Sequence, residues 1–188
     1  MAQSRELPGV IAWLDRASEW LGRSVSWLVL PMMLIQFLIV VLRYAFNFNS
    51  IPMQESVMYM HAVVFMLAAA WTLKHDGHVR VDIFYRAMTP KRKALVDLCG
   101  TLFLLLPVMV FVILTSLNYV GRSWSILEGS PDTGGIPGIF LLKTLIPLFA
   151  VLMLLQALVE ASRHFLVLTG RLAPPDDNDD KPHVEERL

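Results

Sequence analysis

This chain of 188 residues contains four long uncharged stretches. They cover residues 24–42, 56–73, 98–121 and 144–159, and the last reaches full spanning length when 138–142 are added to it. Because an α-helix needs about 20 apolar residues to cross the hydrocarbon core of a bilayer, each stretch is expected to span a membrane. The alternating polarity of an outer-membrane barrel is absent from the sequence. The chain is therefore predicted to be an all-α polytopic membrane protein, which leaves little polar surface for the active site of a soluble enzyme.

Basic residues are distributed unevenly between the connecting segments. Thirteen of the 16 lie in the first 23 residues, between 74 and 93, or after residue 162, and the other three are Arg43, Arg122 and Lys143. Loops rich in Lys and Arg stay in the cytoplasm, so both termini and the middle connection are expected there. The formal net charge of zero does not reveal this uneven distribution of basic residues. No nucleic-acid partner is expected.

The N-terminal segment has a helical pattern of its own. Apolar residues fall near one face of a helix over 6–23, and Trp13, Trp20 and Trp27 recur every seven residues. Tryptophan favours the headgroup region of a bilayer. Residues 1–23 are therefore predicted to form a cytoplasmic amphipathic helix that lies in the membrane interface and contacts lipids. A simple extension of the first span is the alternative.

The rest of the chain divides into a membrane domain and a tail. Residues 24–168 are expected to form a four-helix membrane domain. The tail, 169–188, contains three prolines and an acidic run, so it has too little apolar surface to order itself and is predicted to be disordered. The expected spans are about 24–45, 54–74, 94–120 and 138–162.

Ionisable residues inside a membrane usually mark ion pathways or helix contacts, and this sequence has few. His61 is the one ionisable residue of the spans away from their ends, and no span has a carboxylate at mid-depth. His164 follows the fourth span at its inner end, so the two histidines would differ in depth by roughly 15 Å and could not share one haem iron. Cys99 is the single cysteine, which excludes a disulfide framework or a redox pair within the chain. We therefore expect no metal, haem or other cofactor in this chain.

Two charges flank the short connection between the first and second spans. Arg43 ends the first span and Glu55 begins the second. They are expected either to pin this hairpin through an ion pair or to dock a neighbouring protein. Neither interpretation places them on an ion path.

The connection after the second span carries signals for a helix end and a new helix start. Gly77 suits the residue that caps a helix C-terminus. Thr89 and Pro90 suit the capping residue and the first position of the next helix. His75 and His78 match no zinc-binding spacing, so a metal site here is not expected.

Several short motifs occur in the order found in one family of transporter subunits. They are Arg43-Tyr44-Ala45-Phe46-Asn47, Glu55, Trp71, His78-Val79-Arg80-Val81-Asp82, Arg92, Asp97-Leu98 and Gly100, followed by 125–128, Gly138, Lys143 and Gln156. With these residues the chain resembles, over about 20–168, the DctQ-type small permease of tripartite ATP-independent periplasmic (TRAP) transporters. The second group is similar to the branch often labelled mannitol/chloroaromatic.

The resemblance implies a role. In this family a periplasmic substrate-binding protein delivers a solute, typically an organic acid, to a large DctM-type membrane subunit that imports it with the sodium gradient. The small subunit is taken to be a scaffold for the large one. The resemblance thus implies a non-enzymatic subunit of a heterodimer in the bacterial inner membrane, with sodium bound in the partner. The residues implied to contact the partner or to fix the hairpin are Arg43, Tyr44, Glu55, Trp71, His78, Arg80 and Asp82.

Two other functional classes remain as alternatives. A self-contained oligomeric channel or carrier would require polar residues along a continuous path, and none is evident in the sequence. A membrane anchor that binds quinone or haem would require ligands at one depth, which the histidines do not provide.

Overall fold

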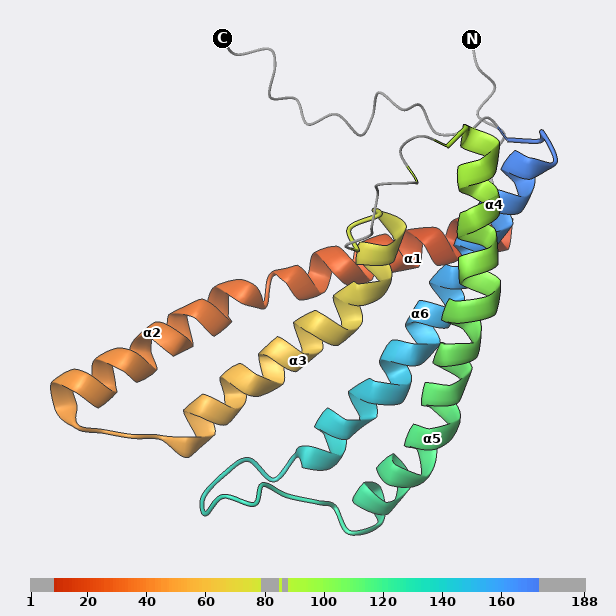
Figure 1. Ribbon diagram of the computed structural model, residues 1–188. Helices are drawn as coiled ribbons and strands as arrows, with labels where there is room; N and C mark the ends of the chain where they lie inside the picture. Colours follow the sequence, from red (N-terminus) through yellow and green to blue (C-terminus); the bar gives the residue numbers. More distant parts are fainter. Residues whose placement is uncertain (1–8, 79–84, 86–87, 173–188) are drawn as a thin grey trace, which may run out of the picture.

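The computed structural model describes residues 9–78, 85 and 88–172, and every regular element among them is helical (Figure 1). Four stretches of this described part are long and apolar enough to cross a membrane, which confirms the predicted all-α polytopic fold class. These stretches are Ile11–Phe46, Ile51–Lys74, Pro90–Ser125 and Ile139–Leu168. The individual elements are α1 (Gly9–Ser26), α2 (Val29–Phe46), α3 (Ile51–Lys74), α4 (Pro90–Gly100), the π-helical turn η1 (Thr101–Leu105), α5 (Leu106–Ser125) and α6 (Ile139–Leu168).

The long helices run between two ends of the molecule. One end, which we call the α1 end, holds α1 together with Lys74, Pro90 and Leu168 (Figure 1). The opposite end, which we call the loop end, holds the connections 47–50 and 126–138. Polar side chains gather at both ends.

A turn at Trp27 and Leu28 separates α1 from α2. Pro31 has no backbone N–H with which to bond the Trp27 carbonyl four residues earlier. That carbonyl instead accepts from the N–H of Leu30 at 3.3 Å. The chain changes direction at this point, so that α1 crosses α3 and α6 at their ends while α2 descends beside α3 (Figure 1).

The folded α1 presents an apolar aromatic face outward. Trp13, Trp20 and Trp27 are 66%, 72% and 71% exposed, whereas Gly22 and Val25 are buried against the rest of the protein. The helix runs from Gly9 to Ser26, three residues further than the sequence pattern indicated. A separate amphipathic helix is thus present, with its tryptophans free to meet lipid.

The end of α3 is capped one residue earlier than expected. Asp76, not Gly77, adopts the left-handed conformation, with φ of 56°. The Gly77 N–H donates to the Thr72 carbonyl at 2.9 Å and the Asp76 N–H to the Leu73 carbonyl at 3.2 Å, which is the Schellman arrangement. Aspartate tolerates this conformation better than most residues, so a glycine is not required there.

The third span contains a π-helical turn that was not predicted from the sequence. The N–H of Leu106 bonds to the carbonyl of Thr101, five residues back. Pro107 follows directly, and in an α-helix its ring would collide with the carbonyl four residues before it. The wider turn relieves that conflict. At the start of the span, Pro90 occupies the first helical turn as predicted, whereas the Thr89 side chain makes no capping hydrogen bond.

Small residues allow α3, α5 and α6 to approach closely. Ala70 on α3 and Ala150 on α6 are 3% and 0% exposed, and they pack with Met109 and Met153 in one core cluster. Helices in membranes associate through such small residues because apolar lipid supplies no hydrophobic driving force between them. Most large apolar side chains on α2 and α5 are exposed, as expected of surfaces that face lipid.

The described chain ends shortly after α6. Gly170 adopts the left-handed conformation with φ of 69°, and the Arg171 N–H bonds to the Leu166 carbonyl at 2.9 Å. The acidic tail predicted to be disordered lies outside the described residues from 173 onward.

Candidate functional site

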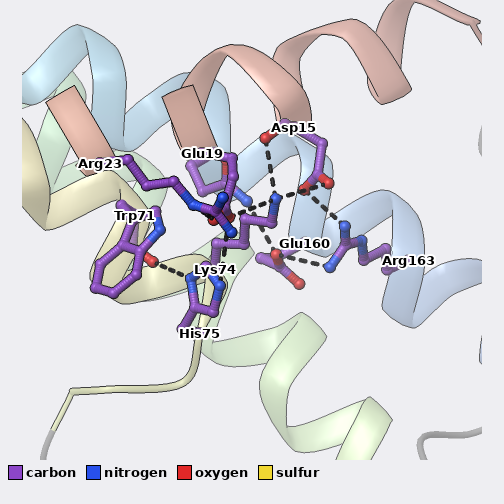
Figure 2. Close-up of polar contacts among 9 residues, drawn as sticks. Asp15, Glu19, Arg23, Trp71, Lys74, His75, Glu160 and Arg163 are labelled. Atoms are coloured by element: carbon purple, nitrogen blue, oxygen red, sulfur yellow. Dashed lines mark hydrogen bonds and ion pairs between the residues drawn. The ribbon is translucent and has the colours of Figure 1, made fainter. Parts of the chain in front are cut away.

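Acidic residues on α1 meet the last residue of α3. Asp15 and Glu19 are four residues apart and therefore lie on one face of the helix. The Lys74 Nζ lies 3.1 Å from Asp15 Oδ2 and 3.1 Å from Glu19 Oε2 (Figure 2). The same ammonium donates a hydrogen bond to the Asp15 carbonyl at 3.1 Å. One side chain thus ties two turns of α1 to α3.

The helix α6 joins the same network. Arg163 Nη2 lies 2.6 Å from Asp15 Oδ1, and its Nη1 lies 3.4 Å from Glu160 Oε1 (Figure 2). Gln156, which is 2% exposed, donates to Glu160 at 3.0 Å. We call this set the α1 junction: Asp15, Glu19, Lys74, Glu160 and Arg163. It connects three helices that are far apart in the sequence.

The α1 junction is partly shielded from solvent. The side chains of Asp15 and Lys74 are each 16% exposed. Ion pairs in water contribute little to stability, whereas removing one partner of a buried pair leaves a charge without compensation. The exposure of these pairs lies between that of a surface pair and that of a fully buried pair. Each charge therefore needs its partner, whereas the intact pair adds only modestly to the stability of the fold.

Close packing accompanies the ion pairs. A Cβ atom added to Gly22 on α1 would lie 2.3 Å from Cγ of Trp71, so only glycine permits this crossing. The ring of Trp71 also contacts the ring of His75 in a tilted arrangement, with centroids 4.4 Å apart, and His75 Nδ1 lies 3.0 Å from the Trp71 carbonyl. The other ring nitrogen lies 3.3 Å from Glu19. Trp71 therefore packs within the chain against α1.

The α1 junction was not among the sites predicted from the sequence. The spacing of Asp15 and Glu19 was a usable signal, since two carboxylates on one face of an apolar helix require cations nearby. Lys74 could have been named as a candidate from the topology, because it ends a span on the same side. Nothing local indicated that Arg163, 148 positions from Asp15, would complete the network.

At the loop end, the connection between α5 and α6 folds over the start of α3. Glu55 is only 8% exposed. One carboxylate oxygen accepts a hydrogen bond from the Ser130 hydroxyl, and the other accepts from the backbone N–H of Ile136. Burial of this charge is therefore compensated by donors from a loop that is distant in the sequence.

Glycine makes that contact possible. A Cβ atom on Gly135 would lie 2.6 Å from Oε1 of Glu55 and 2.3 Å from Oγ of Ser130. A Cβ atom on Gly138 would lie 3.5 Å from the ring of Tyr59, an ordinary contact. We call Glu55, Ser130, Gly135 and Ile136 the loop cradle.

The ion pair considered for Arg43 and Glu55 is not formed. Glu55 is turned toward the loop cradle, and Arg43 makes no ion pair with the described residues. The exposed Arg43 lies in the last turn of α2. The α2–α3 hairpin is therefore not pinned by these two charges.

A second polar contact holds the ends of the same loop together. Lys143 Nζ lies 2.5 Å from Glu128 Oε2 and 4.2 Å above the ring of Tyr119. The hydrogen bond from Lys143 holds the pKa of Glu128 below its usual value of 4.5. Trp124 Nε1 donates to the Thr144 hydroxyl at 2.9 Å, which adds a further link between α5 and α6.

The other residues predicted for the site do not gather in one place. Tyr44 is 82% exposed at the loop end of α2, whereas Trp71 is half-buried at the α1 end. His78 is exposed in the segment after α3. Arg80 and Asp82 lie outside the described residues. Their assignment as partner contacts remains a prediction.

A small apolar cavity lies beside the α1 junction. Its volume is about 240 Å³, and its lining comes from α1, α3 and α6, mainly from Leu14, Leu21, Ala70, Leu152 and Leu155. Cavities that bind solutes usually exceed about 300 Å³ and contain several convergent polar groups. The charged side chains of the α1 junction and the loop cradle are instead bound by protein groups, so both clusters hold helices and loops in position.

Comparison with known proteins agrees with the motif order. The model of the family described as "Tripartite ATP-independent periplasmic transporters, DctQ component" matches residues 32–167, well over half of the chain. No curated protein matched the chain, and no solved structure matched it.

Proposed function

Because the chain belongs to the DctQ family of TRAP transporters, we propose that it acts as a scaffold for the large membrane subunit of such a transporter. The chain is the small membrane component, and a transporter component is not an enzyme. In the proposed complex this chain braces a DctM-type partner, and the partner moves the solute.

The observation that carries the proposal is the use of charge in the described structure. Lys74 and Arg163 are engaged with carboxylates of α1 and α6, and Glu55 is engaged with the 126–138 loop. Groups held in this way stiffen a framework. A solute or ion path would instead require polar groups that face an open passage at mid-depth.

Membership of the family also suggests the solute, the driving ion and the orientation in the membrane. We propose import of an organic acid or a related solute, delivered by a periplasmic substrate-binding protein and driven by sodium that binds in the large subunit. We also propose that the α1 end faces the cytoplasm of a bacterial cell, since most of the described basic residues lie on α1, at the end of α3, at the start of α4 or near the end of α6, whereas Arg43, Arg122 and Lys143 are the described basic residues of the loop end. The mannitol/chloroaromatic branch remains a proposal of the same kind.

Reconstitution into proteoliposomes tests the scaffold role. The tagged chain and the large subunit are purified separately and together, and uptake of labelled organic acids is measured with a sodium gradient and the binding protein. We expect uptake from the complex and none from this chain alone. Sodium-dependent uptake by this chain alone would overturn the proposal and favour a self-contained carrier, and a Soret band in the purified chain would favour a haem anchor.

A further inference from the structure

The α2–α3 hairpin exposes polar side chains in two matching pairs. Gln36 and Arg43 are seven residues apart on α2, and Gln54 and His61 are seven residues apart on α3. A spacing of seven places each pair on one face of its helix. All four residues are exposed.

The two pairs also lie at matching depths. Gln36 lies ten positions before the end of α2 at Phe46, and His61 lies ten positions after the start of α3 at Ile51. At a rise of about 1.5 Å per residue, each is about 15 Å from the loop end of its helix. Arg43 and Gln54 are each three positions from the same ends, at the border of the membrane.

Helix geometry places the pairs on the same side of the hairpin. On α2, Gln36 is about 60° around the axis from Ile39, the buried residue of this helix. On α3, Gln54, Met58, His61 and Phe65 form the exposed stripe, about 140° from the side on which Trp71 and Lys74 meet α1. Because α2 and α3 are both right-handed and run antiparallel, the pair on α2 and the pair on α3 lie on the same side of the hairpin. This is the side away from α1.

The side chains of Gln36 and His61 are energetically unfavourable in hydrocarbon without hydrogen-bond partners. Gln36 and His61 make no hydrogen bond with any residue that the structure describes, and the imidazole stacks only on Phe65 at 6.3 Å. Lipid chains offer neither donors nor acceptors, and polar side chains in membrane helices are therefore used to bind other helices. A lipid headgroup reaches Arg43 at the membrane border but not Gln36, which lies about 10 Å deeper on the same helix.

We propose that this surface, which we call the hairpin face (Gln36, Arg43, Gln54 and His61), docks a transmembrane helix of the large subunit. The inference rests on the proposed scaffold function and identifies the contact surface. The fitting helix carries hydrogen-bonding side chains at mid-depth, opposite Gln36 and His61, and an acidic or carbonyl acceptor near its outer end, opposite Arg43. Within this chain α2 packs on α3, which leaves that face uncovered.

Site-specific photo-crosslinking in the assembled complex tests the surface directly. Benzoylphenylalanine is placed at position 36 or 61, and at position 111 on α5 as the control, where Phe111 is 65% exposed. We expect adducts with the large subunit from 36 and 61, at least fivefold above those from 111. Adducts from 111 alone, adducts joining two copies of this chain, or lipid adducts alone at 36 and 61 would each overturn the proposal.

Substitution provides an independent readout. The double variant Gln36→Leu with His61→Leu should lower the amount of co-purified large subunit about tenfold or more and leave the melting temperature of the isolated chain within about 2 °C. The matched control Phe37→Leu, also exposed on α2, should change neither quantity. Normal co-purification of the double variant would refute the hairpin face and leave the scaffold role intact. Failure of the unmodified chain to co-purify with the large subunit would instead refute the scaffold role, and the inference with it.

Discussion

Oε2 of Glu55 accepts a hydrogen bond from the backbone N–H of Ile136, 81 positions further along the chain. This bond joins the N-terminal part of α3 to the loop that connects α5 and α6. It converts a buried carboxylate, which would be costly alone, into a clamp between two helical hairpins. Variants that break such contacts are expected to lower the stability of the detergent-purified chain.

Replacing Glu55 should loosen the loop cradle. Hydrogen bonds to a charged group contribute about 1.5–3 kcal/mol each, so Glu55→Ala should lower the melting temperature by several degrees. Glu55→Gln keeps an acceptor for the Ile136 N–H and should lose less than half as much. Equal melting temperatures of Glu55→Ala and the unmodified chain would show that the cradle does not hold the loop.

Adding one methyl group at Gly22 should separate α1 from α3. The added Cβ atom would lie 2.3 Å from Trp71, in a helix where alanine is otherwise favoured by about 0.5–1 kcal/mol. Gly22→Ala should therefore lower the melting temperature and increase tryptic cleavage at Arg23. Gly121→Ala, which meets nothing within 4 Å, is the matched control and should be neutral or slightly stabilising. Similar effects of the two variants would contradict the close crossing.

Removing the cation shared by two carboxylates should destabilise the α1 junction. Lys74→Met leaves Asp15 and Glu19 without their common partner, with an expected cost of about 1–3 kcal/mol, between the values for exposed and buried pairs. Hydrogen exchange across α1 should become faster. Arg16→Met, at an exposed position of the same helix, should leave the exchange unchanged. If Lys74→Met leaves α1 as protected as before, packing alone holds this helix.

Acid should weaken the Glu128–Lys143 contact in a defined direction. The Lys143 hydrogen bond holds the pKa of Glu128 below 4.5 in the folded protein. The stabilisation that this contact provides is therefore complete at pH values above the pKa of Glu128 in the unfolded chain. It is lost as the pH falls through the lower pKa that Glu128 has in the folded protein. The melting temperature of the unmodified chain should exceed that of Glu128→Gln at pH 7, and the difference should shrink on titration to below pH 4. A difference that stays constant between pH 7 and 3.5 would exclude an ionic origin.

Arg43→Ala should weaken assembly with the large subunit without lowering the stability of the isolated chain. The exposed Arg43 has no ion-pair partner among the described residues, so its loss should leave the melting temperature of the isolated chain within about 1 °C. Co-purification of the large subunit should nevertheless decrease, because Arg43 belongs to the proposed hairpin face. A fall in melting temperature with unchanged assembly would reverse this assignment.

The number and type of the helices could be predicted from local properties. Span length and apolar content act within one segment, and so does the periodicity that indicated an amphipathic helix before Ser24. Capping was predicted less well. A glycine signal at Gly77 was preferred over Asp76, although aspartate also tolerates the left-handed conformation. The π-helical turn before Pro107 was missed because several backbone adjustments can accommodate a proline, and the choice among them depends on neighbouring helices.

The polar contacts could not be predicted in the same way. Arg43 and Glu55 are close in the sequence and opposite in charge, yet Glu55 binds Ser130 and Ile136. Contacts between distant segments depend on how whole helices pack, and no local pattern encodes the partner.

The sequence alone determined that this protein is a membrane subunit with four spans and an amphipathic first helix, because the transfer of each segment into lipid depends on its own composition. Only the tertiary structure decided which charges neutralise one another. Asp15 meets Lys74 and Arg163, 59 and 148 positions away, because α1, which precedes the turn at Trp27 and Leu28, crosses α3 and α6 at their ends (Figure 1). Once those helices are packed, a charge at their ends must find a partner or remain in water, and the fold determines which partner is within reach.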